Sequence, residues 1–186
     1  MTELRILKVC VISILVALCV ATNYALIGVY NVKVMDFLVF VGGFCFGPIA
    51  GALIGVLSWA VYGVLNPYGF VPQIWLATMF CESIYGVIGG LLGRNLTSNR
   101  FDAQRLQLSV LFGVVGFMLT LIYDIILNVV WALVFEMSAI GAIVVAVPFT
   151  LVHELSNVTI FGLGSLPTIT AVEKIMGVGK VGVSQK

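Results

Sequence analysis

Residues 35–66 read MDFLVFVGGFCFGPIAGALIGVLSWAVYGVLN, and this stretch decides the class of fold. It carries no charged side chain beyond its second residue. One membrane-crossing helix takes about 20 apolar residues, so the run is too long for one straight span and long enough for two short ones. The pair Gly47-Pro48 stands near its middle and interrupts helical structure. We therefore expect one helix over 35–47 and a second over 48–65.

The second half of this stretch has a glycine at every fourth position, namely Gly47, Gly51 and Gly55. Residues four apart lie on the same face of a helix. A stripe of glycines lets two helix backbones approach closely, which is a common way for helices to associate in lipid. We expect the helix over 48–65 to pack tightly against a neighbour through this stripe.

The whole chain has the composition of a membrane protein. Of its 186 residues, 61% are hydrophobic and only 9% are charged, and the mean hydropathy is +1.19. A soluble domain carries about 25% charged residues, and a soluble fold of this length could not bury so much apolar surface. These values predict an all-α, polytopic protein of the cell membrane, with residues 1–186 in one domain. The net charge of +1 gives no indication of a nucleic-acid partner.

Four more apolar segments lie outside the opening stretch, and polar or turn-forming sequences separate them. Gly162, Gly164 and Pro167 interrupt the pattern of the last of these segments, and the sequence leaves open whether its helix continues past Gly162. With the two helices of the opening stretch we expect six transmembrane helices, an even number that places both termini on the same side of the membrane. The four further helices are expected over residues 6–28, 73–93, 107–135 and 142–163.

In this six-helix arrangement almost all basic residues fall on one side of the membrane. Only Lys33 falls on the side opposite the termini. Cytoplasmic loops carry an excess of Lys and Arg, so both termini are expected in the cytoplasm. The basic residues on the side of the termini are Arg5, Lys8, Arg94, Arg100, Arg105, Lys174, Lys180 and Lys186.

Charged side chains in a bilayer core are costly and mark functional sites by default. In three predicted helices such residues share a face with aromatic or large apolar side chains. This combination is typical of a small-molecule pocket, which has mostly apolar walls and a few placed polar groups. The expected substrate-binding residues are Trp75, Met79 and Glu82 in the first of these helices, Asp124, Asn128 and Trp131 in the second, and Phe149, His153 and Asn157 in the third.

Each of these polar residues could instead be a structural contact between helices, worth about 1 kcal/mol. The acids could also pair with His153 and carry no information about a ligand. Trp59 and Tyr62 are interpreted as packing or interface aromatics. No arginine lies inside the predicted spans, and a site for phosphate or carboxylate usually has one, which favours a neutral or cationic ligand.

The sequence contains none of the common catalytic motifs, such as GxSxG, HExxH or a P-loop, and it has one histidine. We therefore expect no enzyme activity, no metal site and no cofactor. Because the chain has no ATP-binding motif, active transport would need a partner.

Short segments spread over nearly the whole chain resemble those of one family. No single segment is specific, but together and in this order they carry the resemblance. They are Ala17-xxx-Ala21, Phe46-Gly47-Pro48-xx-Gly51-Ala52, Asn66-Pro67-Tyr68-Gly69, Tyr123-Asp124-xxx-Asn128, Pro148-Phe149 and Glu173-Lys174-xx-Gly177. On these segments the chain resembles the substrate-binding S components of energy-coupling factor (ECF) vitamin transporters.

The resemblance implies a protein that binds a vitamin or related micronutrient near its outer face. A transmembrane coupling protein and two ATPase subunits would then drive its release inward. The loops 29–36 and 66–72 would gate the pocket. Small residues of the first helix would form the docking surface for the coupling protein. These residues are Ala17 and Ala21, extended by Ser13 and Ala25.

The resemblance also bears on the substrate. The patterns of riboflavin and biotin members are not recognised in this chain. The acid of the helix over 73–93, the tryptophans and the His/Asn pair favour thiamine or another neutral or cationic ring compound. The other interpretations of the chain are a structural or scaffold subunit, a small secondary transporter and, least favoured, an intramembrane enzyme.

Overall fold

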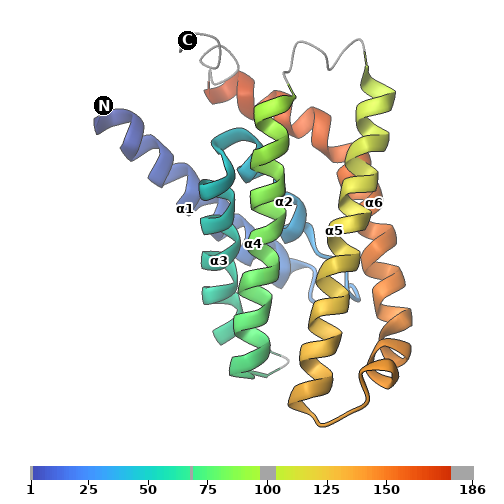
Figure 1. Cartoon of the computed structure of the whole chain (residues 1–186). Coiled ribbons are helices and arrows are strands. Elements are labelled where there is room, and N and C mark those ends of the chain that lie inside the picture. Colours follow the sequence, from blue (N-terminus) through green and yellow to red (C-terminus); the bar gives the residue numbers. More distant parts are fainter. Residues whose placement is uncertain (1, 68, 97–103, 177–186) are drawn as a thin grey trace.

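The computed structural model describes residues 2–67, 69–96 and 104–176 of the chain. These residues form six helices and no strand, which confirms the prediction of an all-α protein. Figure 1 shows that the helices form one bundle in which α5 and α6 lie side by side, as do α3 and α4. The helices are α1 (Thr2–Ala25), α2 (Val34–Phe46), α3 (Pro48–Val64), α4 (Pro72–Asn95), α5 (Arg105–Val134) and α6 (Ala139–Met176).

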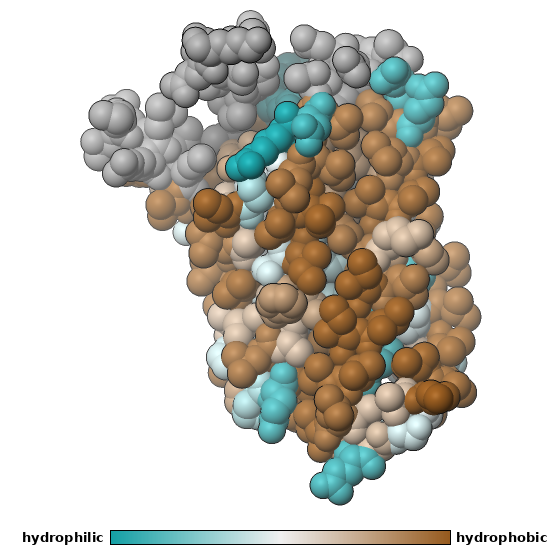
Figure 2. Space-filling view, in the orientation of Figure 1, coloured by the Kyte–Doolittle hydropathy of each residue, from teal (hydrophilic) through white to brown (hydrophobic). Residues whose placement is uncertain are grey.

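Among the described residues, three helices are long and apolar enough to cross a membrane, namely α4, α5 and α6. The part of α1 from Val9 to Ala25, α2 and α3 are apolar but shorter. Figure 2 shows hydrophobic side chains over most of the visible face, with hydrophilic residues gathered toward its two ends. Large apolar side chains such as Ile49 and Leu133 are exposed. Such a surface suits contact with lipid rather than with water.

Helix α2 lies at the centre of the fold. Every residue from Met35 to Phe44 is buried, and α2 packs against α1, α3, α4 and α6. The rings of Phe40 and Phe44 each lie 5.9 Å from the ring of Phe112 in α5. A helix of 13 residues is roughly 20 Å long, which is shorter than the apolar part of a bilayer. Because α2 is surrounded by protein, its length does not have to match the bilayer.

The predicted break between the two helices of the opening stretch is confirmed at Gly47-Pro48. Gly47 has φ 96°, a left-handed conformation that glycine adopts without strain. Its N–H donates to the carbonyl oxygen of Gly43 at 2.7 Å and closes α2. Pro48 then begins α3, at a position where a missing backbone N–H costs nothing. The chain reverses over these two residues, so α3 packs beside α2.

The predicted close packing of α3 through its glycines is also confirmed, and the neighbour is α4. A β-carbon added at Gly51 would lie 2.5 Å from the carbonyl oxygen of Gly86. A β-carbon added at Gly55 would lie 2.9 Å from the backbone of Glu82. Gly47 takes no part, since nothing lies within 4 Å of its added β-carbon. Gly86 could not be singled out from the sequence, because a close approach requires knowing which two helices meet.

The last helix does not end at residue 163, and its continuity past Gly162, which the sequence left open, is found in the structure. Helix α6 is continuous from Ala139 to Met176. A glycine inside a helix costs only about 1 kcal/mol relative to alanine, and in lipid every backbone polar group gains from staying in the helix. Figure 1 shows α6 changing direction along its length, and the prolines inside it, one of them Pro167, each remove one backbone hydrogen bond.

The two ends of the bundle differ. The start of α1, the Gly47 break, the end of α4, the start of α5 and the end of α6 lie toward one end (Figure 1). The connections between α3 and α4 and between α5 and α6 lie at the opposite end. Both of the cavities described below are lined by residues from this opposite end.

Candidate functional site

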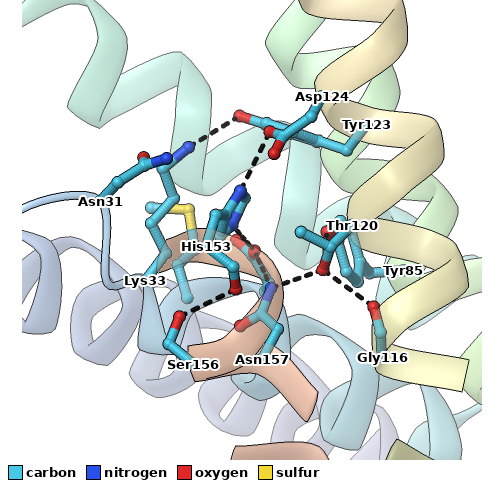
Figure 3. Close-up of polar contacts among 12 residues, drawn as sticks. Asn31, Lys33, Tyr85, Gly116, Thr120, Tyr123, Asp124, His153, Ser156 and Asn157 are labelled. Carbon is cyan, nitrogen blue, oxygen red and sulfur yellow. Dashed lines mark hydrogen bonds and ion pairs between the residues drawn. The ribbon is translucent and has the colours of Figure 1, made fainter. Parts of the chain in front are cut away.

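A buried histidine joins three helices. His153 of α6 has no exposed surface. Its Nε2 lies 2.7 Å from Oδ2 of Asp36 in α2, and its Nδ1 lies 3.0 Å from Oδ1 of Asp124 in α5 (Figure 3). Both ring nitrogens therefore face carboxylate oxygens. We call these three residues and their hydrogen-bonded neighbours described next the His153 network.

The network continues from Asp36 into α4 and α5. The amide of Asn157, one turn beyond His153, donates to Oδ2 of Asp36 at 2.8 Å and to Oγ1 of Thr120 at 2.7 Å. The hydroxyl of Thr120 donates to the carbonyl of Gly116 at 2.8 Å, and the hydroxyl of Tyr85 donates to Thr120 at 3.1 Å. Polar groups away from water are costly unless they are bonded, so this network ties α2, α4, α5 and α6 together.

The ammonium of Lys33 lies beside this network. Lys33 belongs to the connection before α2, and its Nζ donates to the hydroxyl of Tyr123 at 3.4 Å. The same Nζ lies 4.7 Å from the centroid of the Tyr123 ring and 5.8 Å from that of Trp59, within the range of cation–π attraction. Asn31 helps to place the connection, because its amide donates to the carbonyl of Phe149 at 2.7 Å.

A second group of contacts fixes two indoles between α3 and α4. The Nε1 of Trp59 donates to Oε2 of the buried Glu82 at 3.0 Å. The Nε1 of Trp75 donates to the carbonyl of Trp59 at 2.8 Å. The ring of Trp75 also lies against Gly63, where an added β-carbon would collide with it. Both indole N–H groups are therefore engaged within the protein, and both rings are held in place.

Two cavities meet at Trp59. The first, which we call the polar cavity, has a volume of about 240 Å³. The second, which we call the aromatic cavity, has a volume of about 380 Å³. Trp59 and Asn66 line both. The polar cavity is lined by Asn23, Asn31, Lys33, Trp59, Tyr62 and Asn66 among others, and the aromatic cavity by Trp59, Ile74, Trp75, Thr78, Trp131 and Phe135 among others.

The aromatic cavity gathers all three tryptophans of the chain. They come from α3, α4 and α5, and the aromatic ring of Phe135, 4.5 Å from that of Trp131, adds to the wall. Flat rings on several sides of one space favour a flat, apolar ligand.

The structure divides the nine substrate-binding residues expected from the sequence into separate groups. Asp124, His153 and Asn157 belong to the His153 network. Glu82 holds Trp59, and Trp75 lines the aromatic cavity. The alternative pairing of an acid with the histidine is therefore found for Asp124, whereas Glu82 bonds to an indole.

The remaining four expected residues lie in different surroundings. Trp131 lines the aromatic cavity. The carbonyl of Phe149 accepts the Asn31 amide, while its ring packs on another aromatic ring outside the cavities. Met79 and Asn128 are half-buried, and neither lines the polar or the aromatic cavity.

Sequence reasoning missed three residues of this region. Asp36 was not among the expected binding residues, although it lies in the first turn of α2 with no exposed surface. Lys33 was treated only as a marker of sidedness, yet it lines the polar cavity. Trp59 was interpreted as a packing aromatic, and its position four residues after Gly55, on the helix face that meets α4, is the signal that could have placed it near Glu82. A cation at the cavity also removes the argument for a neutral or cationic ligand.

The small residues of α1 lie on its outward face. Ser13, Ala17, Ala21 and Ala25 are all exposed, whereas Cys19 on the other side of the helix is buried. This face is therefore not used for packing within the chain.

The comparisons with known proteins agree with this architecture. Residues 3–174 match the family model described as ECF-type riboflavin transporter, S component. Comparisons with curated proteins and with solved structures gave no match. The matched range includes nearly all of the six helices and both cavities, and it confirms the resemblance to ECF S components while naming riboflavin instead of the expected thiamine. The chain therefore belongs to the family of ECF-type riboflavin transporter S components.

Proposed function

We propose that this chain binds a riboflavin-type ring compound at the polar and aromatic cavities and passes it across the cell membrane with a partner ECF module. The observation that carries this proposal is the aromatic cavity, whose walls include all three tryptophans of the chain. Riboflavin has a flat tricyclic ring and a hydroxylated chain. Stacking between indoles suits such a ring, and the adjoining polar cavity suits such a chain.

The proposal assigns different roles to the residues expected from the sequence. Trp75 and Trp131 contact the ring of the ligand. Glu82 positions the indole of Trp59 through the bond at 3.0 Å. Three residues of the His153 network hold α2, α5 and α6 together beneath the polar cavity, namely Asp124, His153 and Asn157. The other three expected residues pack behind the cavity walls, namely Met79, Asn128 and Phe149.

We further propose that all six helices cross or enter the membrane with both termini in the cytoplasm. Arg94, Arg105 and Lys174 belong to the end of α4, the start of α5 and the end of α6, which lie toward the same end of the bundle. Lys33 shares the wall of the polar cavity with Asn66, which follows α3 at the opposite end. An excess of Lys and Arg marks the cytoplasmic side. The cavities then open toward the outside, where a nutrient arrives.

We propose that the partner module is a transmembrane coupling protein with two ATPase subunits, as the resemblance to ECF S components implies. This module would supply the ATP-binding sites, since the sequence given has no ATP-binding motif. We propose that the coupling protein docks on the exposed face of α1 formed by Ser13, Ala17, Ala21 and Ala25. Small residues on an outward helix face allow the close approach of a second helix within lipid.

Thermal unfolding of the detergent-purified protein with riboflavin, thiamine and biotin tests the proposal. A ligand present at about 100 times its dissociation constant adds about 2.7 kcal/mol to the stability of the folded state. We expect riboflavin alone to raise the melting temperature. Trp131→Ala should remove the shift, while Leu133→Ala, at an exposed position on the same helix, should keep it. A rise in melting temperature with thiamine alone would show that thiamine, not riboflavin, is the substrate. No rise with any of the three compounds, on folded protein, would favour the scaffold interpretation.

A further inference from the structure

The two cavities differ in chemistry although they share a wall. The walls of the aromatic cavity are mostly rings and aliphatic side chains. The polar cavity combines asparagine side chains, such as Asn23 and Asn31, with the ammonium of Lys33. Among the described residues, Lys33 is the only charged side chain that lines either cavity.

Among the described residues no carboxylate makes a close ion pair with the ammonium of Lys33, although Asp36 and Glu82 both lie near enough to interact with its charge. Within the part of the chain that the structure describes, no carboxylate oxygen lies within 4.0 Å of its Nζ. Asp36 is three residues further along, but its Oδ2 accepts from Asn157 and lies 2.7 Å from His153. The contacts of Nζ are the hydroxyl of Tyr123 and two ring faces. An ammonium carries three donors, so Lys33 keeps hydrogen-bonding capacity for a ligand.

The sizes of the cavities indicate that one ligand uses both. Ligand pockets measure about 300–1,000 Å³. The polar cavity, at about 240 Å³, is below this range, and the aromatic cavity, at about 380 Å³, is near its lower limit. Trp59 and Asn66 line both, so the two cavities adjoin at the Trp59 ring. Glu82 keeps that ring in place through its indole N–H.

We propose that the ligand lies across Trp59, with its flat ring in the aromatic cavity and an oxygen-bearing chain in the polar cavity, and that Lys33 determines specificity by donating to oxygens of that chain. The inference rests on the proposed function and deepens it, because it names the part of the ligand that each cavity recognises. The oxygens belong to the hydroxyls of a riboflavin-type chain or to a phosphate at its end.

A first experiment needs no natural ligand. In a Trp75→Phe/Trp131→Phe background, Trp59 is the single tryptophan, and iodide, an anion, is compared with neutral acrylamide as a quencher of its fluorescence. Lys33→Met should lower quenching by iodide about twofold and leave quenching by acrylamide unchanged, because only iodide is attracted by the ammonium. Lys174→Met, at the other end of the bundle, is the matched control. Equal iodide quenching with and without Lys33 would overturn the inference.

A second experiment uses three flavins with the full chain in lipid nanodiscs. Lys33→Met should weaken binding of riboflavin about tenfold, the loss of roughly one hydrogen bond to a charged group. Binding of lumichrome, which has the ring without the chain, should change by less than about twofold because it makes no contact with Lys33. Lys33→Arg should keep most of the affinity. Tighter binding of flavin mononucleotide than of riboflavin identifies a phosphate as the recognised group, and the reverse order identifies the hydroxyls.

The outcomes separate the inference from the proposed function. Equal weakening of riboflavin and lumichrome by Lys33→Met would overturn the placement of the chain in the polar cavity. If the wild-type protein binds none of the three flavins, the proposed substrate is wrong. The iodide result then decides by itself whether the charge of Lys33 attracts anions to the polar cavity. Melting curves of each variant show that it is folded.

Discussion

The Nε2 atom of His153 lies 2.7 Å from Oδ2 of Asp36, although 117 positions separate the two residues in the chain. Both side chains have no exposed surface. The contact fixes the start of α2 against the middle of α6, and the connection that carries Lys33 runs directly into that start of α2. The place of Lys33 at the polar cavity therefore depends on a bond formed deep in the bundle.

Replacing the histidine should destabilise the protein strongly. His153→Leu removes the partner of Asp36 and Asp124 and leaves two buried carboxylates without it. Breaking a buried ionic contact from one side costs about 3 kcal/mol or more. Ser156→Ala, which removes a hydroxyl that donates to the His153 carbonyl on the same helix, should cost less than about 1 kcal/mol. Thermal unfolding in detergent measures the stability of both variants. Equal losses of stability in His153→Leu and Ser156→Ala would show that the His153 network contributes little to the stability of the fold.

The contact between α3 and α4 should tolerate no side chain at Gly86. A β-carbon there would collide with the backbone of Gly51, so Gly86→Ala must push the helices apart at a cost of about 1–3 kcal/mol. At Gly113 of α5 the nearest atom to an added β-carbon is 3.4 Å away, an ordinary contact. Gly113→Ala should therefore be neutral or slightly stabilising, because alanine favours helix. Equal falls in the melting temperatures of Gly86→Ala and Gly113→Ala would contradict this prediction.

Removing the indole donor of Trp59 should reveal how strongly Glu82 depends on it. Trp59→Phe leaves the buried Glu82 carboxylate without this bond and should cost about 1–3 kcal/mol of stability. In the double variant Trp59→Phe/Glu82→Leu the unpaired Glu82 carboxylate is removed as well, so part of the stability should return, although Asp36 then loses its contact with Glu82. Unfolding free energies of the two single variants and of the double variant give the coupling between the residues. Strictly additive effects would mean that the bond at 3.0 Å carries no net energy.

The exposed face of α1 should matter for transport and not for binding. Ala17→Leu/Ala21→Leu adds bulk on the outward face of the helix, so folding and ligand affinity should stay unchanged. Uptake into cells should fall at least about tenfold if a partner helix must approach closely there. Val114→Leu, at an exposed position of α5, adds the same kind of bulk elsewhere and should leave uptake intact. If the α1 variant also lost ligand binding, the substitutions would disturb the fold of this chain rather than the contact with a partner.

Features set by local sequence could be predicted. The break at Gly47-Pro48 depends on the conformations of two adjacent residues, and its position is confirmed. The close packing of α3 follows from the spacing of Gly51 and Gly55 along one helix. The exposure of Ala17 agrees with a face of small residues that has no partner in the chain.

Features set by the meeting of distant segments could not be predicted. The bond between Asp36 and His153 requires knowing that α2 lies against α6. Asp36 stands where the predicted loop 29–36 meets the predicted helix 35–47, and only the central position of α2 makes it buried. The continuity of α6 through Pro167 depends on the environment, since the same residues in water would favour an earlier end.

The burial of α2 on every side has a consequence for how the protein is made. When α2 leaves the ribosome it is about 20 Å long and carries Asp36, so alone it is a poor candidate for stable insertion into lipid. Its partner His153 is synthesised 117 residues later. We therefore expect α2 to remain beside the insertion machinery, held by its hairpin with α3, until α6 arrives. Assembly of this protein would then be completed by its last helix rather than proceed one span at a time.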